Sequence, residues 1–422
     1  MQKGYFLMSA QDPDAAIGAG QAAIEARTAR DTPELTLVGG RVLLPDGALQ
    51  EACVTLADGR IAEVSASEGR PAARRIDLGG RLLLPGIVDL HGDAFEHVLM
   101  PRSGVRFPMD LALAEIDRQL VANGITTAFH SLTYSWEPGL RGRETVVELM
   151  AALDRLGGEL ACQPRVHLRF ELHNVDAVGE VADWLAAGRI DLISLNEHLH
   201  TIADRLERVD KLAQYAERTG LTIDRYKDLV RQVARRGAEV PDTLARICEA
   251  ARAAGIPIAS HDDDSPEVRA HFRGLGARLC EFPVNPETAE AAAAHSDPVI
   301  LGSPNVVRGG SHDARMTAED AVRAGLCSVL TTDYYYPAPL IAAFQLAARG
   351  ACGFAAAWDL VSRGPARAAD LHDRGTIAAG QRADLIAVAA PSGALPRVAA
   401  TWTGGRMTHC AAPDLHGLCG RL

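Results

Sequence analysis

The stretch "LLLPGIVDLHGDAFEH", residues 82–97, is an apolar run that ends in a histidine and, two positions later, an aspartate. Because side chains alternate across an extended chain, His91 and Asp93 point to the same side of such a strand. An imidazole nitrogen and a carboxylate oxygen are suitable ligands for a divalent metal ion. One such pair is a weak signal, so its interpretation depends on what the other strands carry at their ends.

Working outward from this strand, the middle of the chain alternates short apolar runs with amphipathic helical stretches. The strand-like runs begin near Gly86, Ile125, Arg165, Ile190, Ile256, Leu279, Pro298 and Cys327. Eight strands joined by crossover segments predict an α/β protein with a (β/α)8 TIM-like barrel. An open doubly wound sheet is the structural alternative. No Gly-x-Gly-x-x-Gly motif follows the first strand, so a dinucleotide site has no support.

The sequence pattern at both ends of the chain differs from that of the middle. Short β-type runs are separated there by Gly-Gly and Asp-Gly pairs, which are typical of hairpins. We therefore expect a small β-sandwich domain built from residues 35–85 and 376–422, around a (β/α)8 barrel over residues 86–375. Residues 1–34 are expected to form an N-terminal arm.

Composition limits the classes of protein to which this chain can belong. Of its 422 residues, 47% are hydrophobic and 23% charged, which is typical of soluble globular proteins. The net charge of −11 argues against a nucleic-acid surface, and no apolar run is long enough to span a bilayer. The N-terminus lacks a secretory signal, so we expect a cytoplasmic protein with a small-molecule partner. Whether it forms a homo-oligomer is left open.

Polar residues gather where the later strands end. "RVHLRFELHN", residues 165–174, places His167, Arg169 and Glu171 on one face, which looks into a barrel. Burying these charged side chains inside a barrel is unfavourable unless the charges are paired or bind metal. Three further strand-like runs end at His198, His261 and Asp333.

Because the carboxyl ends of barrel strands meet at one rim, these side chains are expected to converge. Nitrogen and carboxylate donors favour zinc, with manganese as the alternative, and one ion or two both remain open. Two ions need a bridging carboxylate. The only lysines are Lys3, Lys211 and Lys227, none of them at a strand end, so a carbamylated lysine is excluded and Glu171 is the bridging candidate. A water molecule activated there would pass its proton to Asp333.

Several segments together resemble a known family. "PGIVDLH" closing the first strand, the late Asp333 and the returning "GTIAAGQRADLIAV" resemble the amidohydrolase superfamily. Within it, "RVHLRFEL", "IASHDDDSPE", "EFPVNPETA", "GSPNVVRGGSH" and "TTDYYYPAPL" resemble the PhnM-type enzymes of phosphonate metabolism. That resemblance implies hydrolysis of α-D-ribose 1-methylphosphonate 5-triphosphate to the 5-phosphate and diphosphate, with a divalent metal.

The resemblance also implies roles for individual residues, with Asp333 as the base. The implied metal ligands are His91, Asp93, Glu171, His198 and His261. The residues expected to contact the substrate are Arg169, Arg308, Gly309, Gly310, Ser311 and His312. The segment "RGGSH" offers a guanidinium, flexible backbone N–H groups and a hydroxyl, which together can cradle an anion. A Gly-Gly turn with an incidental arginine is the plainer interpretation.

Two departures from the family pattern leave the substrate open. The chain reads "HLHTIA" after the fourth strand, where the family has His-Ser-Pro-Gly-Gln, and His130 stands where an aspartate is expected. A hydrolase that cleaves a C–N bond in an amide, a lactam or an amino-substituted ring is therefore the alternative function. A non-catalytic relative without metal is a third hypothesis, which vacant ligand positions would have signalled.

Overall fold

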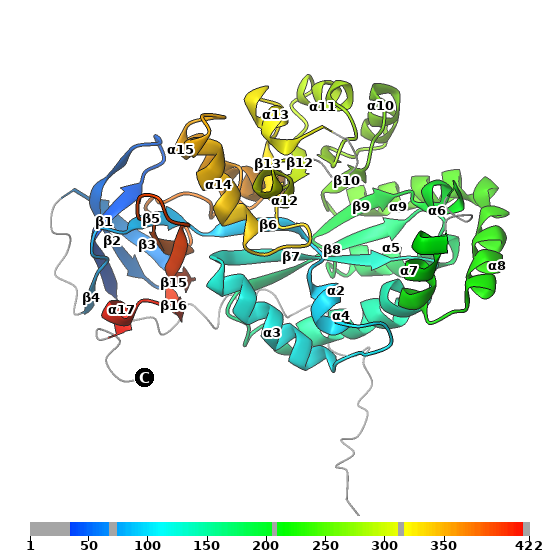
Figure 1. The fold of residues 1–422 in the computed structure, drawn as a ribbon, viewed down its shortest axis with the longest axis horizontal. Coiled ribbons are helices and arrows are strands. Elements are labelled where there is room, and N and C mark those ends of the chain that lie inside the picture. Colours follow the sequence, from blue (N-terminus) through cyan, green and yellow to red (C-terminus); the bar gives the residue numbers. More distant parts are fainter. Residues whose placement is uncertain (1–33, 67–73, 205–208, 311–315, 417–422) are drawn as a thin grey trace, which may run out of the picture.

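A computed structural model describes residues 34–66, 74–204, 209–310 and 316–416 of the chain, and Figure 1 shows its two sheets. The larger sheet contains eight parallel strands in sequential order. Every strand begins within two residues of its predicted start, so the predicted barrel is confirmed. The strands are β6 (Ile87–Gly92), β7 (Ile125–Tyr134), β8 (Gln163–Glu171), β9 (Leu192–Asn196), β10 (Ile258–His261), β11 (Leu279–Glu281), β12 (Val299–Gly302) and β13 (Val329–Thr331).

The barrel closes where the first and last of these strands meet. A parallel bridge joins Gly92 at the end of β6 to Asp333 just after β13. Glycine is needed there because a Cβ at position 92 would lie 2.7 Å from both Asp89 Oδ2 and Thr332 Oγ1. Asp89 also accepts hydrogen bonds from the Thr332 backbone N–H and hydroxyl, at 2.9 and 2.6 Å. These buried contacts fix the end of β13, and therefore Asp333, against β6.

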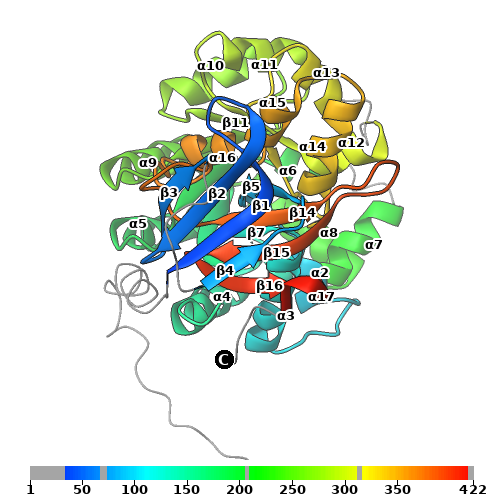
Figure 2. The same cartoon turned by 90° about the vertical axis from the view of Figure 1, so that its left-hand side faces the viewer.

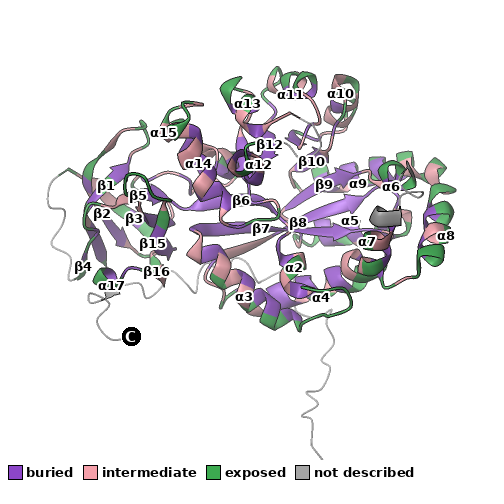
Figure 3. Ribbon diagram, in the orientation of Figure 1, coloured by how far each residue is buried: buried purple, intermediate pink, exposed green. Residues whose placement is uncertain are grey.

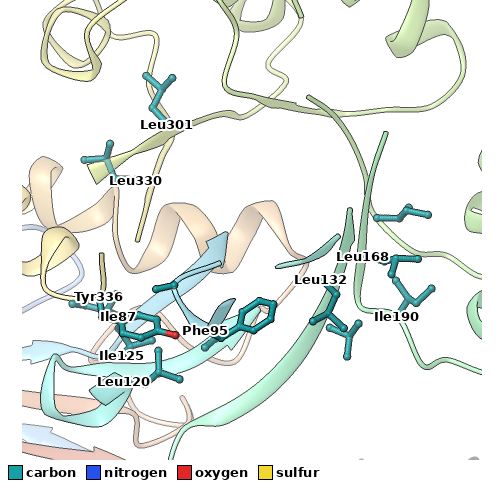
Figure 4. Close-up of a cluster of buried hydrophobic side chains, with 14 of the residues drawn as sticks. Ile87, Phe95, Leu120, Ile125, Leu132, Leu168, Ile190, Leu301, Leu330 and Tyr336 are labelled. Carbon is teal, nitrogen blue, oxygen red and sulfur yellow. The ribbon is translucent and has the colours of Figure 1, made fainter. Parts of the chain in front are cut away.

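Helices cover the outside of the barrel, with their buried faces toward the strands and their exposed faces outward (Figure 3). The main hydrophobic core lies between the two layers, and Figure 4 shows part of it, including Phe95, Leu132 and Leu168. The helices of this layer are α2 (Phe95–Leu99), α3 (Met109–Ala122), α4 (Arg143–Leu156), α5 (Val178–Ala186), α9 (Val240–Ala253), α10 (Pro266–Gly274), α11 (Pro286–Ala293), α12 (Ser303–Arg308), α13 (Ala318–Arg323), α14 (Ala338–Ala348), α15 (Phe354–Asp359) and α16 (Arg363–Ala368).

An insertion of three helices follows β9, before α9 returns the chain to the barrel. They are α6 (Leu199–Asp204), α7 (Val209–Thr219) and α8 (Ile223–Ala234). Leu199, Leu212 and Tyr226 belong to a separate apolar cluster of the insertion, against which Trp136 from the loop after β7 also packs. The α6–α8 insertion therefore has its own small core and stands over one side of the strand ends.

The second sheet is built from both ends of the chain, as the sequence predicted, and packs beside the barrel (Figures 1 and 2). Its order is β16-β15-β14-β5-β1-β2-β3, with β4 paired to β1. Its strands are β1 (Leu35–Leu43), β2 (Leu49–Ala57), β3 (Arg60–Ser65), β4 (Arg74–Asp77), β5 (Leu82–Pro85), β14 (Leu385–Ala389), β15 (Arg397–Thr403) and β16 (Arg406–Cys410), and α17 (Pro413–His416) follows.

The N-terminal arm, the cysteines and the possibility of membrane-spanning helices remain to be described. The predicted N-terminal arm lies outside the described residues except for residue 34, and the exact domain boundaries stay predictions. The seven cysteines among the described residues are all free thiols. In the described part of the chain, no helix combines the length and the apolarity that crossing a bilayer requires.

Candidate metal centre

Side chains from separate strand ends meet at the carboxyl rim of the barrel. Among the described residues, three groups of donor atoms lie within 4.8 Å of one another. The groups are His91 with Asp93 and Asp333, His91 with His261 and Glu281, and His198 with His261 and Asp262. Four of the five predicted ligands and the predicted base therefore belong to connected groups. Glu171, the fifth predicted ligand, belongs to none of them.

The sequence analysis missed Glu281, which is fully buried at the end of β11. Its Oε1 lies 2.7 Å from His91 Nδ1 and its Oε2 lies 2.8 Å from His261 Nδ1. The signal was present, because Glu281 ends the sixth barrel strand as His261 ends the fifth. The one carboxylate holds two histidines that are far apart in the sequence.

Ionisation favours the role of Glu281 as a hydrogen-bond acceptor. Burial alone would raise the pKa of Glu281, but the charge of His91 and the hydrogen bonds from both imidazoles hold that pKa well below its usual range. Burial lowers the pKa of His91, yet the neighbouring Glu281 charge outweighs burial and raises it overall. Glu281 is therefore a carboxylate, to which each Nδ1–H donates.

The tautomer of His261 suits a metal ligand. Its Nε2 lies 3.4 Å from Nη2 of Arg169, and a guanidinium can only donate, so Nε2 accepts and the ring proton sits on Nδ1. The ring edges of both histidines also meet Phe282, at centroid distances of 5.0 Å for His91 and 5.4 Å for His261. A carboxylate behind Nδ1 with the lone pair of Nε2 facing the site is the usual arrangement of metal-binding histidines.

A fourth histidine, His167 in the middle of β8, has an unused acceptor. Its Nδ1 lies 3.0 Å from the Leu90 carbonyl oxygen and 3.1 Å from Ser131 Oγ, so Nδ1 carries the proton. Its Nε2 is buried and has no hydrogen-bond partner among the described residues. Burial lowers the pKa of His167 to about 3, which keeps the ring neutral. The nitrogen and oxygen donors gathered here fit a divalent cation such as zinc or manganese.

Asp333 combines a fixed backbone with a raised pKa. Its N–H donates to the His91 carbonyl oxygen at 2.8 Å, and its own carbonyl oxygen accepts from the Asp93 N–H at 2.9 Å. Burial, together with the nearby Asp93 charge, raises the pKa of Asp333 to about 6, although His91 and Arg169 oppose the shift. A carboxylate with a pKa near neutrality is suited to accept a proton during hydrolysis.

Backbone strain also gathers at this rim. Asp262, Phe282 and Asp333 have φ angles of 58°, 52° and 55°, a left-handed conformation that side chains disfavour. Asp262 and Phe282 come directly after β10 and β11, and Asp333 is the second residue after β13. Strain of this kind is commonly concentrated at functional sites, where the surrounding structure maintains it.

Glu171, the predicted bridging carboxylate, contacts His198 and does not lie between two of the donor groups. Its Oε1 is 2.5 Å from His198 Nδ1, and burial is outweighed by His198 and Arg169, which lower the pKa of Glu171 to about 2. This contact repeats the pattern of a carboxylate behind an imidazole. The predicted bridging role of Glu171 stays a prediction.

The substitution Glu171→Gln tests that role. If Glu171 bridges two ions, the neutral amide should reduce metal occupancy from two ions toward one and weaken binding by about 10–100-fold. Metal analysis and chelator competition on the purified protein measure both quantities. Glu180→Gln is a suitable control, because Glu180 pairs with Arg143 on the outer side of the barrel. Unchanged occupancy would mean that Glu171 only holds His198.

Arg169 stands at the centre of the rim. Its Nη1 lies 3.1 Å from Asp93 Oδ2, and its side chain is almost fully buried. It lines two cavities of about 220 and 200 Å³, together with Asp262. The first cavity contains His91, Asp93, His261 and Asp333, and the second contains Glu171 and His198. We name them cavity 1 and cavity 2, and the predicted contact of Arg169 with substrate stays a prediction.

The predicted anion-binding segment is described only in part. Ser311 and His312 lie outside the described residues. Arg308 is exposed at the end of α12 and its Nη1 donates to the Tyr334 hydroxyl at 3.3 Å. Asn305, one turn earlier in the same helix, lines cavity 1. The bond to Tyr334 ties Arg308 to the residue that follows Asp333, but neither Arg308 nor the two following glycines line cavity 1, and their predicted contact with substrate stays a prediction.

His130, which departs from the expected family pattern, takes no part in these groups. It is buried, and its ring packs edge-on against Phe95 at 6.3 Å. Burial lowers the pKa of His130 to about 4, so it is a neutral core residue. On the same strand, Ser131 and Thr133 belong to the opposite, inward face.

Comparison with known proteins was made for sequence and for structure. The family model described as "Amidohydrolase family" matches residues 82–408. The chain is 32% identical over 340 residues to the α-D-ribose 1-methylphosphonate 5-triphosphate diphosphatase of Escherichia coli (strain K12), covering 78% of this chain and 88% of that protein. It is 29% identical over 368 residues to an imidazolonepropionase of Acidiphilium cryptum (strain JF-5), covering 80% and 87%.

Among solved structures, an amidohydrolase superposes with a TM-score of 0.60 at 17% identity, covering 89% of this chain and 99% of the other. At that identity the similarity concerns the fold alone.

Proposed function

This chain belongs to the amidohydrolase family and is a metal-dependent hydrolase, and we propose that it hydrolyses α-D-ribose 1-methylphosphonate 5-triphosphate. In the proposed reaction, a water oxygen forms a bond to the α-phosphorus and the bond from that phosphorus to the bridging oxygen breaks. Diphosphate leaves, and the 5-phosphate remains on the sugar. The proton released by water passes to Asp333.

The identity to the Escherichia coli diphosphatase, extending over most of both chains, is the observation that carries this proposal. The position of Arg308 adds support. Its guanidinium bonds to Tyr334, the residue after the proposed base, and we expect the phosphates of a substrate at cavity 1 to extend to it. Arginine is well suited to phosphate because its planar fork donates two parallel hydrogen bonds.

The residues of this chain have separable roles in the proposal. His91, Asp93, His198 and His261 would hold the metal, with Glu281 and Glu171 orienting the histidines. When bound, a divalent ion polarises phosphoryl oxygens and makes water more acidic. Asp333 holds the proton, and Arg169 and Arg308 contact anionic oxygens of the substrate. The ends of the barrel strands keep these groups in fixed positions.

An alternative is hydrolysis of a C–N bond in a different small molecule, which the weaker similarity to imidazolonepropionase supports. Both reactions would use the same donor groups and the same base. The two are separated by the product, so incubation of metal-replete protein with the ribosyl triphosphate should release diphosphate, detected by phosphorus NMR. A chelator should abolish this release and added zinc or manganese should restore it. Release of ammonia or acid from amides and lactams, without diphosphate, would favour the alternative.

Arg308→Ala tests the contact with the phosphates. We expect the KM for the ribosyl triphosphate to rise about tenfold, since one charge-assisted hydrogen bond to an exposed group is lost. Metal content should not change, because Arg308 belongs to none of the donor groups. Arg231→Ala is the matched control: Arg231 is also an exposed arginine, paired with Asp228 on α8. An unchanged KM would exclude Arg308 from substrate binding.

A further inference from the structure

Cavity 2 has no role in the reaction as described so far, although it borders the candidate metal centre. It lies between the ends of β7 and β8 and the α6–α8 insertion. Because Arg169 and Asp262 line both cavities, the two cavities are adjacent at these side chains. A substrate whose reacting bond lies at the metal centre can therefore extend one end into each cavity.

The wall of cavity 2 contains a buried hydroxyl with nothing to bind. Thr133 is only 4% exposed, and its Oγ1 has no hydrogen-bond partner among the described residues. The Nε of Arg169 in the same wall is likewise buried and unpartnered in this part of the chain. Buried polar atoms are unfavourable unless they are paired, so both atoms point to a polar ligand.

Two aromatic rings line the same cavity. Trp136 comes from the loop after β7, and Tyr215 comes from α7. Both pack against the buried ring of Tyr226, at centroid distances of 6.4 and 6.0 Å. Because Tyr226 supports them, the two rings offer an apolar surface with polar groups beside it. Such a wall suits a ligand that has an apolar face and polar substituents.

The charges of cavity 2 are already neutralised in pairs. Arg141 binds Glu96 and Arg218 binds Glu137, with nitrogen–oxygen distances of 2.9 and 2.7 Å. Such pairs offer N–H donors and carboxylate acceptors side by side, which suits hydroxyl groups because these both donate and accept. The wall contains three arginines and three carboxylates, so it has no excess of positive charge to attract a polyanion.

We propose that cavity 2 is the binding site for the pentose part of the substrate, a ribose ring with its single phosphonate ester. The diphosphate end then lies over cavity 1, toward Arg308. This assignment rests on the proposed function and deepens it, because it states which end of the substrate enters which cavity. The ring packs on Trp136 and Tyr215, and a sugar hydroxyl bonds to Thr133 Oγ1.

Binding of D-ribose 5-phosphate and of inorganic phosphate to the metal-replete full chain, measured by calorimetry, tests the assignment. The wild-type protein should bind the sugar phosphate more tightly than phosphate. Thr133→Val should weaken the sugar phosphate alone by about three- to tenfold, the effect of one hydrogen bond. Its melting temperature should not fall, because the removed hydroxyl has no hydrogen-bond partner in the described part of the chain. Trp136→Ala should also weaken sugar binding, and Trp136→Phe should largely retain it.

Thr126→Val, on the same strand, is the matched control. The Thr126 hydroxyl donates to the Ile87 carbonyl oxygen at 3.3 Å and does not line cavity 2, so this variant should lose stability but not affinity. Equal affinity of wild-type protein for ribose 5-phosphate and phosphate would overturn the assignment, as would an unchanged affinity in Thr133→Val. If the protein releases diphosphate but Thr133→Val binds the sugar phosphate as tightly as the wild type, only the assignment of cavity 2 is wrong. Weakened sugar binding without diphosphate release would keep cavity 2 as a pentose-binding site and remove the proposed function.

Discussion

Replacing Asp333 with asparagine should lower kcat by about 10²–10⁴-fold, because the amide cannot accept the proton that water releases. The fold should be retained. The backbone bonds of Asp333 to His91 and Asp93 do not involve the substituted group, and asparagine tolerates the left-handed conformation at φ 55°. The measurement is steady-state turnover of the ribosyl triphosphate, with metal analysis and a thermal melt on the same sample.

Asp370→Asn is the matched control for the substitution at Asp333. Asp370 has the same φ of 55° but is exposed on the surface, so its substitution should leave turnover unchanged. Full activity in Asp333→Asn would remove Asp333 from the mechanism.

The same role predicts an acid limb in the pH profile. The pKa of Asp333 is raised to about 6, and a base must be deprotonated to act, so kcat should rise with pH through that region. A bound cation beside the carboxylate would oppose this rise in pKa, which places the limb at or below pH 6. A profile that instead falls as pH rises from 5 to 7 would contradict the assignment of Asp333 as base.

Glu281→Gln should weaken metal binding by about 10–100-fold, with a matching loss of activity at limiting metal. The reason is that each carboxylate oxygen of Glu281 accepts a hydrogen bond from a different imidazole. Glutamine keeps one oxygen and replaces the other with an NH2 group, which only donates. Either His91 or His261 must then accept at Nδ1 and move its proton to Nε2, the atom that a metal needs.

Chelator competition measures the metal affinity of Glu281→Gln, and nitrogen NMR of the imidazoles reports which ring nitrogen carries the proton. Glu171→Gln is an informative comparison, since Glu171 serves only one imidazole and the amide oxygen can still accept from His198 Nδ1. Unaltered metal affinity and unaltered tautomers in Glu281→Gln would show that Glu281 has no positioning role.

The sequence allowed the barrel to be predicted because its periodicity is local. Each strand is an apolar run of a few residues, and the polar residue that ends it can be recognised from the alternation of side chains. His91, Asp93, His261 and Asp333 were found in this way, and the structure brings them into connected donor groups. Glu281 ends the sixth barrel strand, so the same criterion identifies it, although the sequence analysis assigned it no role.

The order of elements, the strand ends that carry donors and the sheet shared by both termini were therefore determined by the sequence alone. Tertiary structure decided which donors touch. It placed Glu281 between His91 and His261, which are 190 and 20 residues away from it, and placed Glu171 behind His198. It also formed cavity 2 from a strand end and the α6–α8 insertion. Alternation fixes the face on which a side chain lies, but distances across a barrel depend on how its strands are staggered when it closes, and that stagger is set by packing over the whole sheet.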